Sequence, residues 1–368
     1  MPIASYSESG HAATLKQSAH LLVQGDHILS MRHITRQMRA GWLLVLLLLV
    51  SVALPGHARE GQSTCTGGPI GVSEHLQRID LTGCLSYLED PEHNFTLEDV
   101  QAREREGALT AHTDGILNFG YTRSAYWVRF DLLYAGSTAQ RDAVLELVLP
   151  LADEVTLYQI TPDGGRIERH LRYDGDWRLR EIAVPNPAFR VELQADVPST
   201  FYLRIYSRNT LRIPLILWST DSYPAKVAVD EAIQGLFLGS MLAIFAYNLF
   251  VTLAVRDRGY MLYSLYLLFA TLFVFTEQVH GQQLFNGRPW FLDKELLHFH
   301  IWLAWFWGLH MARELLETRT RPQAWGLDHI LRLATFAVVT SFVLSLVVDY
   351  HVAMHWTVMF SIFLAVLM

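Results

Sequence analysis

The stretch Tyr173-Asp174-Gly175-Asp176-Trp177 places two carboxylates and an indole ring close together. Asp174 and Asp176 flank a flexible glycine, so their oxygens could converge on a hard cation such as Ca²⁺, which takes about six to eight oxygen ligands. Trp177 offers a flat ring on which a sugar could stack. The alternative is a solvated turn between two strands, because aspartate and glycine favour turns.

A second pair of candidate ligand-binding residues, Trp127 and Arg129, lies in an alternating stretch. The apolar residues of 126–132 recur every second position, which predicts a strand with one face in a core and one face in water. On the outer face, an aromatic ring beside a guanidinium could hold a glycan or an anionic ligand. The alternative is that Trp127 packs between two sheets and Arg129 pairs with a neighbouring acid.

The sequence carries no catalytic signature. It lacks the patterns of a phosphate-binding loop, a zinc protease, a serine hydrolase, a kinase and a diguanylate cyclase. We therefore predict that this chain is not an enzyme and needs no cofactor, apart from the Ca²⁺ considered above. The net charge of −7, without a basic stripe, argues against a nucleic-acid partner.

Residues 31–58 have the organisation of a secretory signal peptide. Basic residues precede an apolar core at 42–54, and small residues precede a cleavage site after Ala58. An uncleaved membrane anchor is the alternative. Residues 1–30 show no such pattern, so we expect them to be an upstream extension and translation to start near Met31.

Export would place the following segment in the bacterial periplasm, where disulfides form. Cys65 and Cys84 are the two cysteines of the sequence. A bond between them would close a loop of roughly 20 residues and contribute about 3 kcal/mol of stability in the chain-entropy model. Two free thiols are the alternative. Two cysteines are too few for a zinc ribbon or an iron–sulfur ligand set.

Short alternating segments separated by turn residues dominate residues 59–228. They lie at 143–151, 153–160, 166–173, 188–193, 200–207 and 211–219. Strands at this spacing predict an exported all-β sandwich or jelly roll.

Residues 229–368 change to long apolar segments. Five of them are candidate membrane spans, at 232–255, 260–281, 296–316, 330–348 and 351–368. Basic residues gather in the first and third connections, which predicts a multi-pass inner-membrane protein in contact with the lipid bilayer and with its β domain in the periplasm. Because the sequence ends inside an apolar segment, we expect a truncated chain.

The first apolar segment contains Gly235 and Gly239 in a GxxxG pattern, which permits close helix contact. We expect a packing seam within the helical bundle or the face of a homodimer. Asn248 is polar at membrane depth and is expected to bond another helix. His351 and His355, one helical turn apart, would suit a metal, although histidines at a membrane surface are also ordinary rim residues.

Four stretches, in this order, resemble the bacterial seven-transmembrane receptors with diverse intracellular signalling modules. They are YLEDPEHNFTLEDV (87–100), NFGYTRSAYWVRFDL (118–132), TFYLRIYSRNTLRIPLILWS (200–219) and AYNLFVTLAVRDRGYMLYSLYLLF (246–269). The resemblance implies a periplasmic sensor of the second extracellular type, a jelly roll similar to carbohydrate-binding modules. It also implies seven helices and a cytoplasmic histidine kinase or diguanylate cyclase, of which five helices and no output module are present.

The sequence thus predicts a receptor that senses a small, carbohydrate-like ligand in the periplasm and relays it to an output module or other signalling proteins. One alternative is a transporter or permease with an exported accessory domain, which would need charged groups or broken helices at mid-membrane. A truncated remnant without a signalling role is the other.

Overall fold

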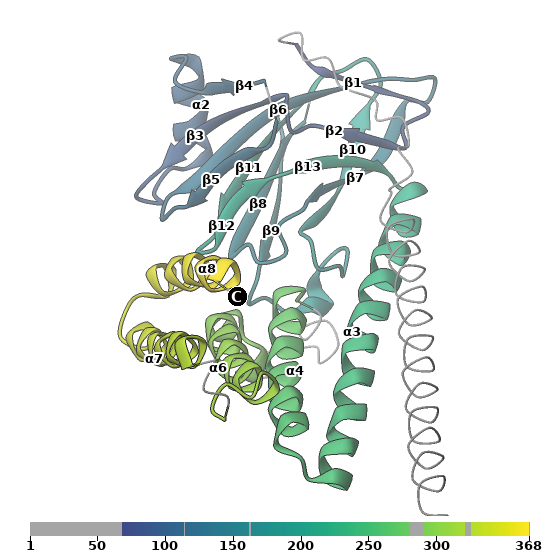
Figure 1. Ribbon diagram of the computed structural model, residues 1–368. Helices are drawn as coiled ribbons and strands as arrows, with labels where there is room; N and C mark the ends of the chain where they lie inside the picture. Colours follow the sequence, from purple (N-terminus) through teal and green to yellow (C-terminus); the bar gives the residue numbers. More distant parts are fainter. Residues whose placement is uncertain (1–67, 114, 162, 280–289, 321–324, 368) are drawn as a thin grey trace, which may run out of the picture. The chain divides into compact units, whose positions relative to one another are not determined.

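Strands occupy the first part of the described chain and helices the second (Figure 1). The computed structural model describes residues 68–113, 115–161, 163–279, 290–320 and 325–367. The predicted signal peptide, the upstream extension and Cys65 lie outside these residues.

The strands have the following bounds: β1 (Ile70–Ser73), β2 (Arg78–Asp80), β3 (Leu85–Asp90), β4 (Thr110–His112), β5 (Leu117–Tyr121), β6 (Ala125–Ala135), β7 (Gln140–Leu147), β8 (Glu154–Ile160), β9 (Arg166–Arg172), β10 (Ala188–Gln194), β11 (Ser199–Tyr206), β12 (Thr210–Ile213) and β13 (Leu215–Ser219). The helices are α2 (Leu97–Arg105), α3 (Ser222–Val255), α4 (Arg258–Glu277), α6 (Leu297–Leu315), α7 (Trp325–Ser345) and α8 (Tyr350–Leu367). Short 3₁₀ turns are η1 (Trp177–Leu179), η2 (Trp290–Leu292) and η3 (Lys294–Leu296).

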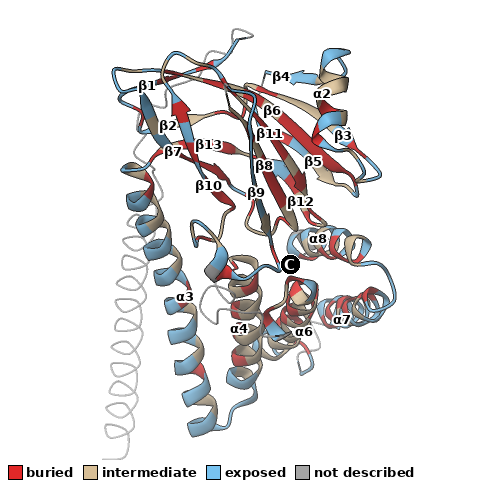
Figure 2. Ribbon diagram, turned by 180° about the vertical axis from the view of Figure 1, so that it is seen from behind, coloured by how far each residue is buried: buried red, intermediate tan, exposed pale blue. Residues whose placement is uncertain are grey.

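Two sheets enclose the main core of the β domain. One runs in the order β4-β3-β6-β11-β8-β9, with β1 also paired to β6, and the other in the order β10-β7-β13-β2. Apolar side chains from both sheets form one buried cluster, in which Phe130 stacks on Phe201 with ring centres 5.1 Å apart. Figure 2 shows this buried material along the strands. The predicted all-β sandwich followed by a helical region is confirmed.

The alternation along β6 is confirmed on its core side, and on the other side it holds for Arg129 and Asp131 but fails at Trp127. Tyr126, Val128 and Phe130 are buried in the core between the sheets, as the period of two predicts. Trp127, expected to face water, is only 1% exposed, because α2 lies over it. Helix α2 was missed in a region interpreted as strands and turns. Its start is fixed by a capping box at its N-cap, Thr96.

The segment 211–219 was predicted as one strand and forms two. Pro214 separates β12 from β13, and these strands pair with different partners, β12 with β5 and β13 with β7 and β2. Proline has no N–H to donate to a sheet ladder, so it favours a break at this position.

In the described part of the chain after the sandwich, the helices α3, α4, α6, α7 and α8 overlap the five apolar segments. Among the described residues, α3, α4 and α7 are long and apolar enough to cross a membrane. The apolar part of α8, Tyr350–Ala365, is shorter. Helix α3 begins at Ser222, directly after β13 and before the predicted span, so its first turns belong to the β domain's edge. This direct continuation leaves no free linker between the sandwich and the first long helix.

Candidate functional site

A cluster of charged residues lies where the sandwich meets the helices, within the compact unit Glu60–Met368. Its sandwich side is built by two loops. Asp153 precedes β8 and Arg208 follows β11, and because these strands are antiparallel neighbours the two loops meet at one end of the sheet. The backbone N–H of Arg208 donates to Asp153 Oδ2 at 2.8 Å, and Arg208 Nε donates to Oδ1 at 3.1 Å.

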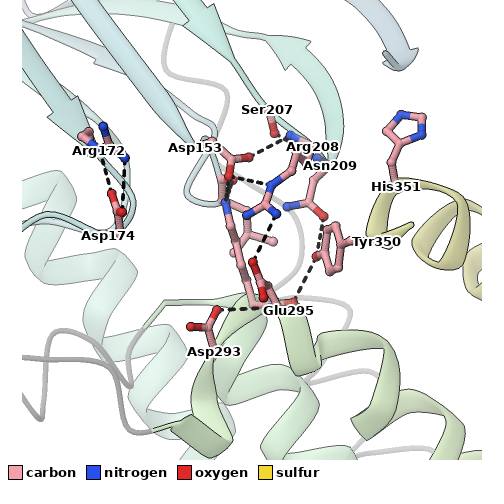
Figure 3. Close-up of polar contacts among 12 residues, drawn as sticks. Asp153, Arg172, Asp174, Ser207, Arg208, Asn209, Asp293, Glu295, Tyr350 and His351 are labelled. Atoms are coloured by element: carbon pink, nitrogen blue, oxygen red, sulfur yellow. Dashed lines mark hydrogen bonds and ion pairs between the residues drawn. The ribbon is translucent and has the colours of Figure 1, made fainter. Parts of the chain in front are cut away.

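The helical side of this cluster is Lys294 and Glu295, in the short turn before α6. Lys294 Nζ lies 2.6 Å from Asp153 Oδ1, and its side chain is only 2% exposed. Arg208 Nη1 donates to Glu295 Oε1 at 3.1 Å (Figure 3). Asp153 therefore joins a cation of the sandwich to a cation of the helical region. We call Asp153, Arg208, Lys294 and Glu295 the junction network.

Helix α8 also reaches the junction network. The Tyr350 hydroxyl donates toward Asn209 Oδ1 and the Lys294 carbonyl oxygen, each at 3.0 Å. The Arg208 guanidinium lies 5.4 Å from the centre of the Tyr350 ring. One tyrosine thus connects the sandwich, the turn before α6 and the start of α8.

Burial and charge act against each other in this network. Burial lowers the pKa of Lys294, and the nearby carboxylate of Asp153 opposes that shift. Burial also acts on Arg208, but Asp153 and Glu295 outweigh it and raise the pKa of the guanidinium. The network therefore depends on Asp153, because a buried ammonium without its counter-ion is costly.

A cavity of about 540 Å³ opens beside the junction network. Its lining comes from both regions and includes His93, Glu154, Arg172, Asp174, Tyr206 and Glu295. This volume falls in the range of small-molecule sites, about 300–1,000 Å³. The cavity is a candidate ligand site.

A second charged contact holds the N-terminal turns of α3 against the sandwich. Glu146 on β7, whose side chain is 1% exposed, accepts from Lys226 of α3. It also accepts from Trp218 Nε1 at 2.9 Å and from Asn186 Nδ2 at 2.8 Å. The four-stranded sheet thereby holds the first long helix.

The loop predicted to bind calcium contributes Asp174 to the lining of the cavity, but this carboxylate pairs with an arginine. Asp174 forms a two-pronged ion pair with Arg172, at 2.9 and 3.3 Å (Figure 3). Asp176 is exposed. No group of three or more potential metal ligands occurs among the described residues. Trp177 is 5% exposed and packs against Tyr173, so its ring is not open for stacking in this structure.

The predicted Trp127 and Arg129 face is covered. Trp127 stacks on Tyr158, with ring centres 5.6 Å apart, beneath α2. Arg129 pairs with Glu104 of α2 at 3.0 Å and with Asp131 at 2.7 Å. The structure gives Trp127 a packing position between a sheet and a helix, rather than between two sheets.

Gly235 and Gly239 of α3 do not form a packing seam with the described helices. Gly235 and Gly239 are exposed, and no atom lies within 4 Å of a Cβ built at either position. Asn248 is buried, but its amide donates to Ile244 of its own helix at 2.8 Å. Cys84 is disulfide-bonded, and its predicted partner Cys65 lies outside the described residues, so the pairing stays a prediction.

The sequence analysis did not identify the residues of the junction network, although the scarcity of lysine pointed to one of them. The chain has three lysines, and the two in the described part, Lys226 and Lys294, both pair with an acid of the sandwich. Asp153 and Glu146, their partners, sit in or beside apolar strand segments. A rare cation next to a membrane span and a lone acid in an apolar strand were therefore the available clues.

Comparisons with known proteins agree with this architecture. The family model described as 7TMR-DISM extracellular 2 matches residues 82–219, and the one described as 7TM diverse intracellular signalling matches residues 230–368. No curated protein matches the chain.

Two solved structures are weakly similar. An isomalto-dextranase from Arthrobacter globiformis T6, complexed with panose, has 6% identity and a TM-score of 0.20, with 38% of this chain and 22% of the enzyme covered. The module TmCBM61, in complex with β-1,4-galactotriose, has 6% identity and a TM-score of 0.17, with 39% and 83% covered. Similarities this low support no conclusion.

Both matching family models describe parts of one receptor type, and they follow each other along most of the chain. The first covers the sandwich and the second the helices described above. Neither is a catalytic type. The protein therefore belongs to the 7TMR-DISM family, and it is a multi-pass membrane receptor with an extracellular sensor domain and a seven-transmembrane region.

Proposed function

We propose that this receptor lies in the bacterial inner membrane, binds a small ligand through its periplasmic sandwich and relays binding to a cytoplasmic output module. The observation that carries the proposal is the junction network. Asp153 holds Arg208 of the sandwich and Lys294 of the helical region at the same time. A change in the sandwich that moves this carboxylate acts directly on the turn before α6.

The contacts of the helix connections support the proposed sidedness. Glu295 before α6 pairs with Arg208, and Asp349 before α8 lies 3.5 Å from Arg123 of the sandwich. These two connections therefore lie on the sandwich side of the bundle. The basic residues that mark cytoplasmic loops occur in the other two connections, near Arg256 and Arg319.

The two sheets hold different helices, which provides a route for the relay. The four-stranded sheet holds α3 through Glu146 and Lys226, whereas the seven-stranded sheet holds α6 and α8 through Asp153 and Arg208. A ligand that shifts one sheet relative to the other would displace α3 relative to α6 and α8. Such coupling requires only that the ligand favour one of the two arrangements.

The resemblance in sequence favours a carbohydrate-like ligand and a histidine kinase or diguanylate cyclase as the output. The transporter alternative would require ionisable groups at mid-membrane. Arg313 and Asp328 lie near ends of α6 and α7 and pair with each other at 3.0 Å, and Lys226 pairs with Asp230 in the first turns of α3. This arrangement favours the receptor.

The relay can be tested with the full chain in lipid nanodiscs by hydrogen–deuterium exchange. We expect Asp153→Asn to raise amide exchange at the starts of α6 and α8, because the Lys294 and Tyr350 contacts weaken. The matched control is Glu98→Gln, which disturbs an exposed ion pair with Arg166 on the same sandwich and should leave these helices unchanged. Faster exchange confined to the loop of residue 153 would refute the relay.

A further inference from the structure

The charges on the walls of the junction cavity cancel in pairs. Arg172 is held by Asp174, and Arg208 by Asp153 and Glu295. Glu154 accepts from Arg204 at 2.7 Å. An ionic ligand would have to break one of these pairs or add an uncompensated charge beside them, and both are costly at the largely buried pairs of Asp153 and Glu154.

Hydroxyl groups fit such walls without that cost. Each hydroxyl both donates and accepts, so it can bond a carboxylate and a guanidinium of the same ion pair. Arg172 and Asp174 are still 56% and 40% exposed, which leaves room for such bonds from the cavity side. Tyr206 adds a half-buried aromatic ring to the lining, against which the C–H face of a sugar can pack.

The cavity also has the position that a relay needs. Glu154, Arg172 and Asp174 belong to the sandwich, whereas Lys294 and Glu295 belong to the turn before α6, and all five line the same space. An occupant would contact both regions at once. Binding there would change the separation of the two sides of the junction network directly.

We propose that the junction cavity is the ligand site of this receptor and that it takes a neutral polyhydroxylated molecule, of the size of a mono- or disaccharide. That binding here starts a signal rests on the proposed function. The inference adds where the ligand binds and that the ligand is uncharged. The loop of Asp174 then contributes hydroxyl contacts through its ion pair with Arg172, rather than a calcium site.

The test is calorimetric titration of the full chain in nanodiscs. Glucose, galactose and maltose are the neutral probes, and glucuronate and glutamate are the charged ones. We expect a neutral probe to bind at least tenfold more tightly than either charged probe. The double variant Arg172→Ala/Asp174→Ala removes one wall pair without changing the net charge and should weaken that binding at least tenfold.

The matched control is Arg166→Ala/Glu98→Ala, which removes an ion pair from the other end of β9, away from the cavity. It should leave the affinity unchanged, and the melting temperatures of both double variants show whether they fold. A Glu154→Gln variant keeps the shape of the wall but removes a carboxylate that faces the cavity, so it should also weaken binding while its melting temperature shows that it folds. The proposal is overturned if no neutral probe binds, if charged probes bind equally well, or if Arg172→Ala/Asp174→Ala and Glu154→Gln both bind like the wild type.

Failure of the site and failure of the relay give different results. Sugar binding without any change in exchange at α6 and α8 would support the site and contradict the relay. A response of these helices to Asp153→Asn, without sugar binding, would support the relay and overturn the site.

Discussion

Single residues decide how the sandwich of this receptor holds its helices. Asp153 accepts from the Lys294 ammonium, the Arg208 side chain and the Arg208 backbone, so one carboxylate satisfies three donors. Lys294 is nearly fully buried, and its charge is tolerable because Asp153 lies beside it. The contribution of Asp153 to stability therefore depends on Lys294, and that of Lys294 depends on Asp153.

We predict that Asp153→Asn destabilises the protein by about 3 kcal/mol, as the loss of one partner of a buried ion pair does. The double variant Asp153→Asn/Lys294→Met, which removes both charges, should recover most of this loss. Calorimetric melting of the full chain in nanodiscs measures both. Equal destabilisation in the single and double variants would show that the pairing with Lys294 is not what stabilises the junction.

Calcium provides a second test at this scale. Because Asp174 is engaged by Arg172, we predict that added calcium and chelators leave the melting temperature unchanged. A ligand that bound the native state alone would raise it by mass action. A calcium-dependent rise that disappears in Asp174→Asn/Asp176→Asn would instead support the metal site predicted from the sequence.

Among the structural elements, helix α2 has the largest effect on the candidate sites. It covers Trp127 with Leu97 and Val100, and it presents Glu104 to Arg129 and to the Tyr202 hydroxyl, 2.5 Å away. Burial and this carboxylate raise the pKa of Tyr202, so the hydroxyl stays a donor. The helix thereby covers the predicted binding face, and the covered side chains form a second, smaller hydrophobic core.

We predict that Trp127→Ala costs about 3–5 kcal/mol, as the removal of a large buried aromatic side chain does. Leu179→Ala is the control, because that side chain is 84% exposed and should contribute little. Calorimetric melting of the full chain distinguishes the two roles of Trp127. Unchanged stability together with lost sugar binding would instead identify Trp127 as a ligand-binding residue.

At the scale of the whole molecule, the arrangement of helices must place the sandwich and two helix connections on one side of the membrane. Figure 2 shows that α3 is exposed along most of its length, as expected for a helix facing lipid or further protein. The contacts from Arg208 to Glu295 and from Arg123 to Asp349 require both of those connections to share a compartment with the sandwich.

Reporter fusions test this topology directly. We predict cytoplasmic activity for fusions at Arg258 and Arg319 and periplasmic activity for a fusion at Asp349, because loop charge and the sandwich contacts agree. A fusion after Tyr223, inside the first turns of α3, serves as the periplasmic control. Reversed activity at any two of the three test sites would contradict the topology.

Local sequence patterns were sufficient to predict the order of the domains and whether each is built of strands or helices. The period of two along β6 identified the core positions Tyr126, Val128 and Phe130, and the long apolar segments marked the helices. Both signals are local, because side-chain periodicity reports which face of a strand or helix is apolar.

Contacts between distant parts of the chain determine what covers the other faces and which charged side chains pair. Trp127 looked solvent-facing because the helix that buries it comes from an earlier part of the chain. Asp153 and Lys294 are far apart in the sequence, and no local pattern links them. Ion pairs and covering helices arise from long-range packing, so the junction, its cavity and the fate of the predicted binding residues became visible only when the sandwich and helices were placed together.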